Sequence, residues 1–213
     1  MSDRVVMVTG AAGNLGRALV KAFTASGASV VPIDLPTNLL DQAQVDAAVQ
    51  KAIQQFKRID VLCNIAGGFR MGAPVHETSD KDWNFLFDLN ARTVLHTARA
   101  VVPHMIAAGG GKIVNVGAYA AQKGAAQMGA YIASKSAVIR LTETMAAELR
   151  DKNINVNCVL PTIIDTPENR AAMPKADPRR WVAPEDLASV IVFLASDAAR
   201  AIHGAALPVT GLS

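Results

Sequence analysis

The sequence has few of the residues that build disulfide frameworks or metal sites. Only two cysteines, Cys63 and Cys158, occur among its 213 residues, and both lie inside apolar stretches typical of strands, VLCNI and VNCVL. We therefore expect buried structural thiols. The four histidines show neither His-x-x-x-His spacing nor a Cys-x-x-Cys companion, so no metal site is predicted.

The sequence also lacks strong charge of one sign and long hydrophobic runs. Its 21 Lys and Arg against 18 Asp and Glu give a formal charge of +3, and the basic residues are scattered. This pattern indicates neither a nucleic-acid surface nor a membrane-surface patch. The apolar runs are strand-sized, and MSDRVVMVTG enters a strand at once without a signal peptide. We expect a cytoplasmic protein whose partner is a small molecule.

Short β-branched runs alternate with longer stretches of helical period along the whole chain. This alternation is typical of an α/β protein with a doubly wound parallel sheet and helices on both faces. We expect one domain over 1–213, with about seven strands. The clearest strand patterns are 4–8, 28–34, 59–67, 112–117, 154–161 and 206–211. Helices are predicted from Leu15 to a left-handed cap at Gly27, from Asp41, over 79–108, over 129–150 and from Pro184.

Three local features depart from a plain alternation. Only LPTN separates Asp34 from Leu39, whereas a crossover between parallel strands usually contains a helix, so the helix after the second strand is predicted to be missing or very short. The long helix 79–108 opens on a capping box at Ser79 and is expected to be disturbed at Pro103. The segment 162–183 has no clear periodicity and could form a mobile lid.

A glycine-rich turn, TGAAGNLG, joins the first strand to the first helix. Glycines at 10, 13 and 16 bring backbone N–H groups and the positive helix end toward an anion, as in a dinucleotide pyrophosphate site. The spacing differs from Gly-x-Gly-x-x-Gly, and a plain strand-turn-helix corner would also explain it. Asp34 ends the second strand, where a carboxylate can accept from ribose hydroxyls and repel a 2′-phosphate. The pair of signals favours NAD over NADP; an incidental turn aspartate is the alternative.

Tyr131 and Lys135 are four residues apart on a predicted helix and therefore share one face. A phenol with an ordinary pKa near ~10 carries protons poorly at neutral pH, but a cation within ~4–6 Å lowers the pKa. The pair therefore suits general acid-base catalysis. An ordinary surface tyrosine and lysine at this spacing are the competing interpretation.

Taken together, these motifs resemble the short-chain dehydrogenase/reductase family. The glycine turn, Asp34, NIAG at 64–67, Asn90, the Tyr131/Lys135 pair and PTIIDT at 161–166 occur in the family's order and spacing over essentially the whole chain. The resemblance implies a single NAD(P)-binding Rossmann-type domain that uses NADH. It also implies a homodimer or homotetramer, formed through the long helices 79–108 and 129–150.

The resemblance also implies roles for individual residues. Tyr131 would be the general acid/base, Lys135 would hold the nicotinamide ribose and lower the Tyr131 pKa, and Asn90 would support a proton-relay water. Ile164 and Thr166 would bind the carboxamide and phosphate region of the cofactor. The cofactor contacts implied in full are Gly10, Gly13, Asn14, Leu15, Gly16, Asp34, Asp41, Ala66, Gly67, Tyr131, Lys135, Ile164 and Thr166.

Four positions depart from the family pattern. Asn14 replaces a glycine, Ile65 replaces the second asparagine of Asn-Asn-Ala-Gly, and Thr162 replaces the glycine of Pro-Gly. Ala118 stands 13 residues before Tyr131, where the family usually has a serine that hydrogen-bonds the substrate carbonyl. Because an oxyanion donor is worth ~2.7–4 kcal/mol in other enzymes, its absence should impair the reduction of a simple ketone.

One branch of the family offers an account of this substitution. GAYAA at 117–121, the run 159–177 with Trp181 and the lost helix after Asp34 resemble dihydropteridine reductase, which also lacks the serine. Its quinonoid substrate is already electrophilic and needs little carbonyl polarisation, while Tyr131 can still protonate a ring nitrogen. The predicted substrate contacts are therefore Phe69, Ala118 and Tyr131. Phe69 could equally be an aromatic residue that packs its own loop.

Two other functions remain open at this stage. In the first, the protein reduces an ordinary ketone or 3-oxoacyl substrate, and Gln122, Tyr119 or a water replaces the serine. In the second, it is a dinucleotide-binding redox sensor without turnover. Retention of both Tyr131 and Lys135 argues against the sensor, because binding alone does not require the tyrosine.

Overall fold

The computed structural model describes all residues, 1–213, as one parallel α/β domain. Six strands form a single sheet in the order β2-β1-β3-β4-β5-β6, and every neighbouring pair is parallel. The strands are β1 (Val5–Thr9), β2 (Ser29–Ile33), β3 (Val61–Asn64), β4 (Gly111–Val116), β5 (Ile154–Pro161) and β6 (Ala206–Val209). The predicted doubly wound architecture is confirmed.

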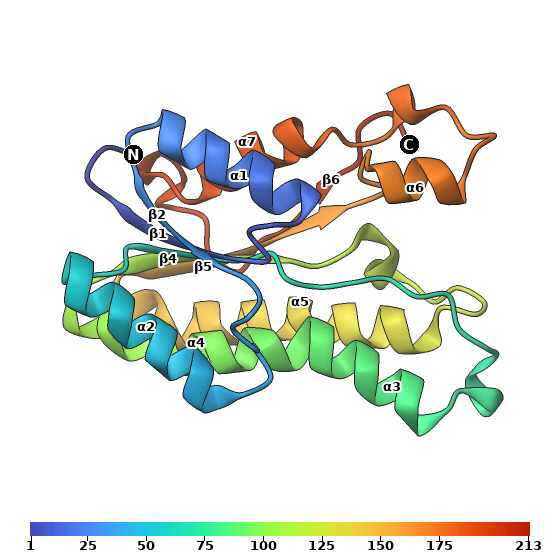
Figure 1. Ribbon diagram of the computed structural model, residues 1–213, viewed down its shortest axis with the longest axis horizontal. Helices are drawn as coiled ribbons and strands as arrows, with labels where there is room; N and C mark the ends of the chain where they lie inside the picture. Colours follow the sequence, from blue (N-terminus) through green and yellow to red (C-terminus); the bar gives the residue numbers. More distant parts are fainter.

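Helices cover both faces of the sheet (Figure 1). One face carries α1 (Asn14–Ala25) and α7 (Pro184–Leu194), while the other carries α2 (Gln42–Phe56), α4 (Thr93–Ala107) and α5 (Gly129–Leu149). Alternate residues of each strand enter different cores. In β1, Val6 and Val8 pack toward α1 and α7, whereas Met7 packs with residues of α2 and α4. This is why the central strands read as continuous apolar runs.

The sheet has six strands, close to the expected number of about seven, and β2 forms one of its edges. No helix lies between β2 and Asp41, as the short LPTN connection predicted; α2 begins at Gln42, and Asp41 caps it. The α2 crossover then leads directly to β3, on the other side of β1. The order in which successive strands are added to the sheet therefore changes direction at β1, and the crevice at the carboxyl ends of β1 and β3 is where ligands bind in open sheets of this kind.

The helix expected over 79–108 is interrupted. Ser79 caps α3 (Asp80–Phe87), as predicted, by accepting from the backbone N–H of Asp82 at 3.1 Å. A π-helical turn, Asp88–Arg92, then separates α3 from α4. Pro103, where a disturbance was expected, does not end the helix, because α4 continues through this proline to Ala107. The π turn lies at the crevice and carries Asn90, and such turns are frequent at functional sites.

The remaining elements complete the lid and the interior. The segment expected to lack regular structure contains a short helix, α6 (Pro167–Ala172), and a 3-10 turn at Pro178–Arg180. Both cysteines are buried free thiols, as expected, and burial raises the pKa of Cys158 to about 11. None of the helices combines the length and the apolar character needed to cross a bilayer.

Candidate active site

The glycine turn leaves several backbone donors free at the start of α1. Gly13 precedes the helix, no side chain caps it, and the N–H groups of Asn14, Leu15 and Gly16 have no acceptor within the protein. Unpaired donors at the positive end of a helix form an anion site. An anion at this position, such as the predicted pyrophosphate, would be held by backbone N–H groups alone.

Close approach of the backbone explains the glycines in this turn. Gly10 has φ +65, and a Cβ there would lie 3.0 Å from the backbone N and Cα of Ala66. A Cβ on Gly16 would lie 2.1 Å from the carbonyl oxygen of Gly10. The turn after β1 and the turn after β3 consequently touch, and neither position accepts a side chain without displacement.

Thr9 fixes the second of these turns. Its hydroxyl accepts from the backbone N–H groups of Ile65 and Ala66, at 3.0 and 3.2 Å. Sequence reasoning did not identify this residue, although it directly precedes Gly10. Thr9 is buried, so it acts by holding NIAG against the glycine turn.

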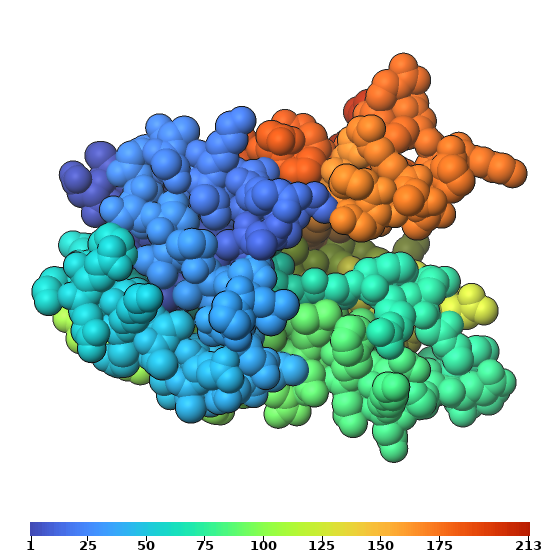
Figure 2. All heavy atoms as spheres, viewed as in Figure 1, coloured from blue at the N-terminus to red at the C-terminus, as the bar shows by residue number.

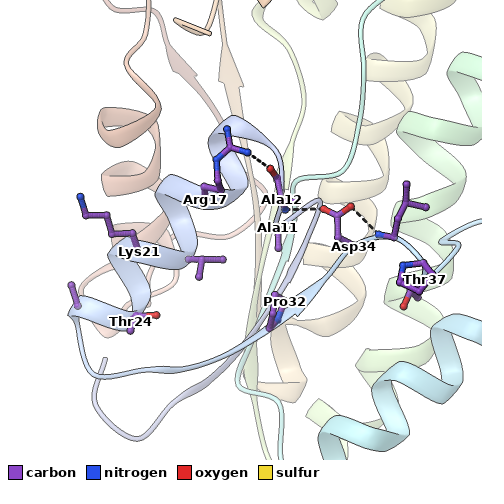
Figure 3. Close-up of a pocket in the computed structure, with 12 residues that line it drawn as sticks. Ala11, Ala12, Arg17, Lys21, Thr24, Pro32, Asp34 and Thr37 are labelled. Atoms are coloured by element: carbon purple, nitrogen blue, oxygen red, sulfur yellow. Dashed lines mark hydrogen bonds between the residues drawn. The ribbon is translucent and has the colours of Figure 1, made fainter. Parts of the chain in front are cut away.

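Asp34 lies beside the glycine turn, at the end of β2. Its two carboxylate oxygens accept from the backbone N–H groups of Ala12 and Leu35, both at 2.8 Å. Each oxygen keeps a free lone pair, so the carboxylate can still accept from ribose hydroxyls. Figure 3 shows Asp34 directed toward Ala12 at one side of a hollow of about 910 Å³, with Arg17 and Lys21 along α1.

Part of this hollow results from the missing helix after β2. Pro32 and Leu35 border it, and Leu35 is 83% exposed, because no helix covers this side of the edge strand. Asp41, the other acid implied as a cofactor contact, is engaged elsewhere: it accepts from the N–H groups of Ala43 and Gln44 and from the Gln44 side chain. The structure assigns Asp41 to the cap of α2.

Asn90 and Lys135 meet around Gly67. A Cβ on Gly67 would lie 2.9 Å from the Asn90 Oδ1 and 3.0 Å from the Lys135 Nζ. The Lys135 ammonium donates to the carbonyl oxygen of Val116 at 2.8 Å. Burial lowers the Lys135 pKa to about 8. The structure therefore brings together NIAG, the π turn and α5, as the sequence predicted.

Asn90 is 1% exposed and fully hydrogen-bonded. Its Oδ1 accepts from the N–H of Gly68 at 2.9 Å, while its Nδ2 donates to the Gly68 carbonyl and to the Ser134 hydroxyl. Ser134 in turn donates to the carbonyl oxygen of Tyr131 at 2.8 Å. Sequence reasoning missed Ser134, although it directly precedes Lys135. The amide side chain of Asn90 thus ties the loop after β3 to the turn of α5 that carries the tyrosine.

Tyr131 is held in an apolar setting. The Phe69 ring meets it edge-to-face with ring centroids 4.9 Å apart, although Phe69 itself is 58% exposed. Burial raises the Tyr131 pKa to about 12. The expected lowering of this pKa by Lys135 is wrong for the protein alone, because desolvation dominates and the Lys135 ammonium bonds the Val116 carbonyl. At neutral pH the tyrosine is a protonated donor.

Ala118 contributes no polar group to the site. It is 4% exposed and belongs to an apolar cluster that includes Val94, Val138 and Leu160, against which Tyr131 packs. The two side chains considered as substitutes for the serine, Tyr119 and Gln122, lie on the following 3-10 turn and are exposed. Tyr131 thus packs against apolar side chains here, and it also lines a small pocket with Arg70, Thr78 and Gln127.

The lid residues stand across the crevice from these groups. Ile164 forms an isolated parallel bridge with Val182, and Thr166 caps α6 by accepting from the N–H of Asn169 at 3.2 Å. Figure 1 shows α6 beyond the amino end of α1. No group of three His, Cys, Asp or Glu side chains comes together anywhere in the chain.

An anion cradle at a helix start, an acid at the end of β2 and a half-buried tyrosine one helical turn from a buried lysine together define a dinucleotide-dependent oxidoreductase. A family model described as "Enoyl-(Acyl carrier protein) reductase" matches residues 6–211. The chain belongs to the short-chain dehydrogenase/reductase family, and it is an enzyme of the oxidoreductase class.

Two curated relatives illustrate the match. The chain is 33% identical over 242 residues to D-threitol dehydrogenase of Mycolicibacterium smegmatis, covering 99% of this chain and 93% of the relative. It is 32% identical over 241 residues to the 3-oxoacyl-[acyl-carrier-protein] reductase FabG of Thermotoga maritima, and this alignment covers 99% of this chain and 98% of FabG. These alignments are longer than 213 residues, so the relatives contain segments that this chain lacks.

A solved structure extends the similarity to the fold. Carveol dehydrogenase from Mycobacterium avium in complex with NAD superposes with a TM-score of 0.91 at 26% identity, covering 99% of this chain and 97% of that one. These comparisons establish the family and the reaction class.

Proposed function

We propose that the protein transfers hydride from NADH to a conjugated or quinonoid acceptor of the dihydropteridine type. The observation that carries this proposal is Ala118: an apolar side chain, buried in the apolar cluster against which Tyr131 packs, occupies the position of the family serine. An acceptor that is already electrophilic needs a proton more than it needs carbonyl polarisation. The exposed Phe69 ring, beside Tyr131, could stack on a planar substrate.

The residues of the crevice fit a dinucleotide. The free N–H groups at the start of α1 suit the pyrophosphate, and Asp34 suits the hydroxyls of the adenosine ribose. Relatives include an NAD-dependent glycerol dehydrogenase of Listeria innocua, which is 33% identical, and the structural neighbour noted above contains NAD. When bound, NADH supplies the hydride. The Asp34 carboxylate would disfavour the 2′-phosphate of NADPH.

The protein's own residues supply the proton. Tyr131, with a pKa raised to about 12, is protonated at neutral pH and can donate its hydroxyl proton to the acceptor. The transfer leaves a tyrosinate in an apolar setting, where a nearby cation stabilises it. Lys135 keeps its proton below its pKa of about 8 and provides that cation. Asn90 holds the loop after β3 and the Tyr131 turn in fixed relation.

A second candidate is the reduction of an ordinary ketone or 3-oxoacyl substrate. The identity to FabG and to D-threitol dehydrogenase favours it. In that case Tyr119, Gln122 or a water takes the place of the serine at the carbonyl oxygen; both side chains are exposed on the 3-10 turn after Ala118. We also expect a homo-oligomer, because apolar side chains such as Trp83, Phe85 and Leu95 remain exposed on α3 and α4.

The test is NADH oxidation against quinonoid dihydropterin, a 3-oxoacyl thioester and a simple ketone. Tyr131→Phe should abolish turnover and leave NADH binding intact, whereas Tyr119→Phe, which changes the chain's other tyrosine, should have no effect on the quinonoid substrate. Loss of ketone reduction in Tyr119→Phe would instead favour the second candidate. If the parent protein binds NADH but its turnover is no higher than that of Tyr131→Phe on any of the three substrates, the redox-sensor function is favoured instead.

Ala118→Ser separates the two substrate classes. A serine there should raise activity on the simple ketone and lower it on the quinonoid substrate, and the opposite pattern would count against the proposal. The added hydroxyl enters an apolar cluster and should cost about 1–3 kcal/mol of stability if it finds no partner. Ala121→Ser is the matched control, because Ala121 is buried in the same cluster one turn later.

A further inference from the structure

The lid segment is held together mainly by its own hydrogen bonds. The Asn169 side chain donates to the Ile164 carbonyl at 2.8 Å, and Arg170 forms a two-pronged ion pair with Asp165, at 2.6 and 2.7 Å. By contrast, α6 contains no buried residue and packs extensively against no other helix or strand. Its position relative to the rest of the domain therefore depends on a small number of specific contacts.

One such contact joins the lid to the glycine turn. Asn14 Nδ2 donates to the Glu168 carboxylate at 2.9 Å. Asn14 is the first residue of α1, and Glu168 is the second residue of α6. Figure 2 shows atoms of the two segments in contact above the hollow of the crevice, and Figure 1 shows the corresponding helix ends facing each other.

Arg17 determines which end of the Asn14 amide faces the lid. Its guanidinium donates to Asn14 Oδ1 at 2.7 Å. Because the oxygen is occupied by this donor, Nδ2 is directed to the only kind of partner it can use, an acceptor. A glycine at position 14, which most members of the family have, offers no side chain for this bond. The departure from the family pattern at Asn14 thus has a structural role.

We propose that Glu168 is a positioning residue, which fixes the lid to the cofactor cradle through Asn14 and thereby slows the release of NADH. Thr166 and Ile164 lie two and four residues before Glu168, in the same hydrogen-bonded unit. Anchoring α6 to the start of α1 sets both residues opposite the free N–H groups of the glycine turn. The proposal rests on NADH as the cofactor, as inferred above.

The negative charge of Glu168 has a separate effect, because it lies at the helix end that the cofactor pyrophosphate, also an anion, would approach. Its carboxylate stands near the positive end of α1, whose first turn contains no acid of its own. The backbone N–H of Glu168 and the Thr166 hydroxyl hydrogen-bond this carboxylate, and with smaller contributions from Asn14 and the charge of Arg17 they hold the Glu168 pKa below its usual range, so the group is an anion at neutral pH. A cofactor pyrophosphate approaches the same helix end. Glutamine at 168 keeps an acceptor for Asn14 and removes this like charge.

The experiment is a double-mutant cycle on NADH release, measured by stopped-flow fluorescence with Glu168→Ala, Asn14→Ala and the double variant. Each single change should raise the dissociation rate about two- to fivefold, the range for an exposed polar pair, and the double variant should show no further increase. Glu168→Gln should stay within about twofold of the parent. Additive effects of the two single changes would overturn the proposal.

Glu185→Ala is the matched control. Glu185 is also exposed, and it also follows the proline that starts a helix, in this case Pro184 of α7. Its replacement should leave the rate of NADH release unchanged. An effect equal to that of Glu168→Ala would show a general charge effect and reject the proposed link between Glu168 and Asn14.

A cofactor-free measurement separates this proposal from the proposed function. Hydrogen exchange of the Arg170 and Met173 amides, which bond within α6, should be faster in Glu168→Ala than in the parent. Equal exchange would overturn the positioning role. If the parent binds no NADH at all, the proposed cofactor is wrong, while faster exchange in the variant would still support the link between lid and glycine turn.

Discussion

Replacing Asp34 by alanine should change which cofactor the protein binds. The carboxylate accepts hydrogen bonds from the backbone N–H of Ala12 in the glycine turn and from that of Leu35 just after β2, both at 2.8 Å. Its remaining lone pairs are available to two ribose hydroxyls. At a net value of roughly 0.5–1.5 kcal/mol for each hydrogen bond, losing the two ribose bonds should weaken NADH binding by about 5- to 150-fold.

NADPH should respond differently to the same change. It loses the anchoring of the turn equally, but it gains from removal of a carboxylate that would face its 2′-phosphate. The ratio of the NADPH to the NADH dissociation constant should therefore fall at least about tenfold in Asp34→Ala. Fluorescence titration with both cofactors at fixed ionic strength measures this ratio. If both affinities weaken equally, Asp34 acts only as an anchor of the turn, and its assignment to cofactor selection is refuted.

Three further predictions concern the cap, the lysine and the glycine turn. Asp41→Ala should lower the free energy of unfolding, measured in urea, by about 1 kcal/mol through loss of the α2 cap, and it should leave the NADH dissociation constant unchanged. If the variant instead keeps its stability in urea and binds NADH more weakly, Asp41 is a cofactor contact after all. The kcat/KM for reduction should fall as pH rises through about 8, because Lys135, with a pKa lowered to about 8, then loses its proton. The neighbouring Cys158 stays neutral over this range because its pKa is raised to about 11. A pH profile that is flat up to pH 9.5 would contradict this. Gly10→Ala should cost about 1–2 kcal/mol or more in urea unfolding, since φ is +65, whereas Gly124→Ala, with nothing within 4 Å of its Cβ, should be neutral; equal costs would refute the argument.

The parallel sheet and its helices follow from local patterns that tertiary contacts do not override. β-branched runs buried on both faces specify central strands, and Asp41 and Ser79 mark helix starts because their side chains satisfy free N–H groups. The absence of a helix after β2 was predictable from chain length alone. The π turn at Asp88–Arg92 was not, because its sequence pattern continues the helical period on both sides.

The candidate site was predictable in its members and less so in its electrostatics. Spacing placed Tyr131 and Lys135 on one face, but burial shifts the pKa of each, and the burial arises only in the folded chain. Ser134 and Thr9 escaped notice because a single hydroxyl beside a motif carries no signal until its partners are known.

The sequence by itself determined the fold class, the glycine turn with Asp34, and the tyrosine-lysine pair, since each depends on residues near one another in the chain. Tertiary structure alone decided that the Tyr131 pKa rises, that Ala118 faces an apolar cluster, and that Asn14 reaches Glu168 across 154 positions. The physical reason is the same in each case: burial and hydrogen-bond partnership are set by segments that only folding brings together.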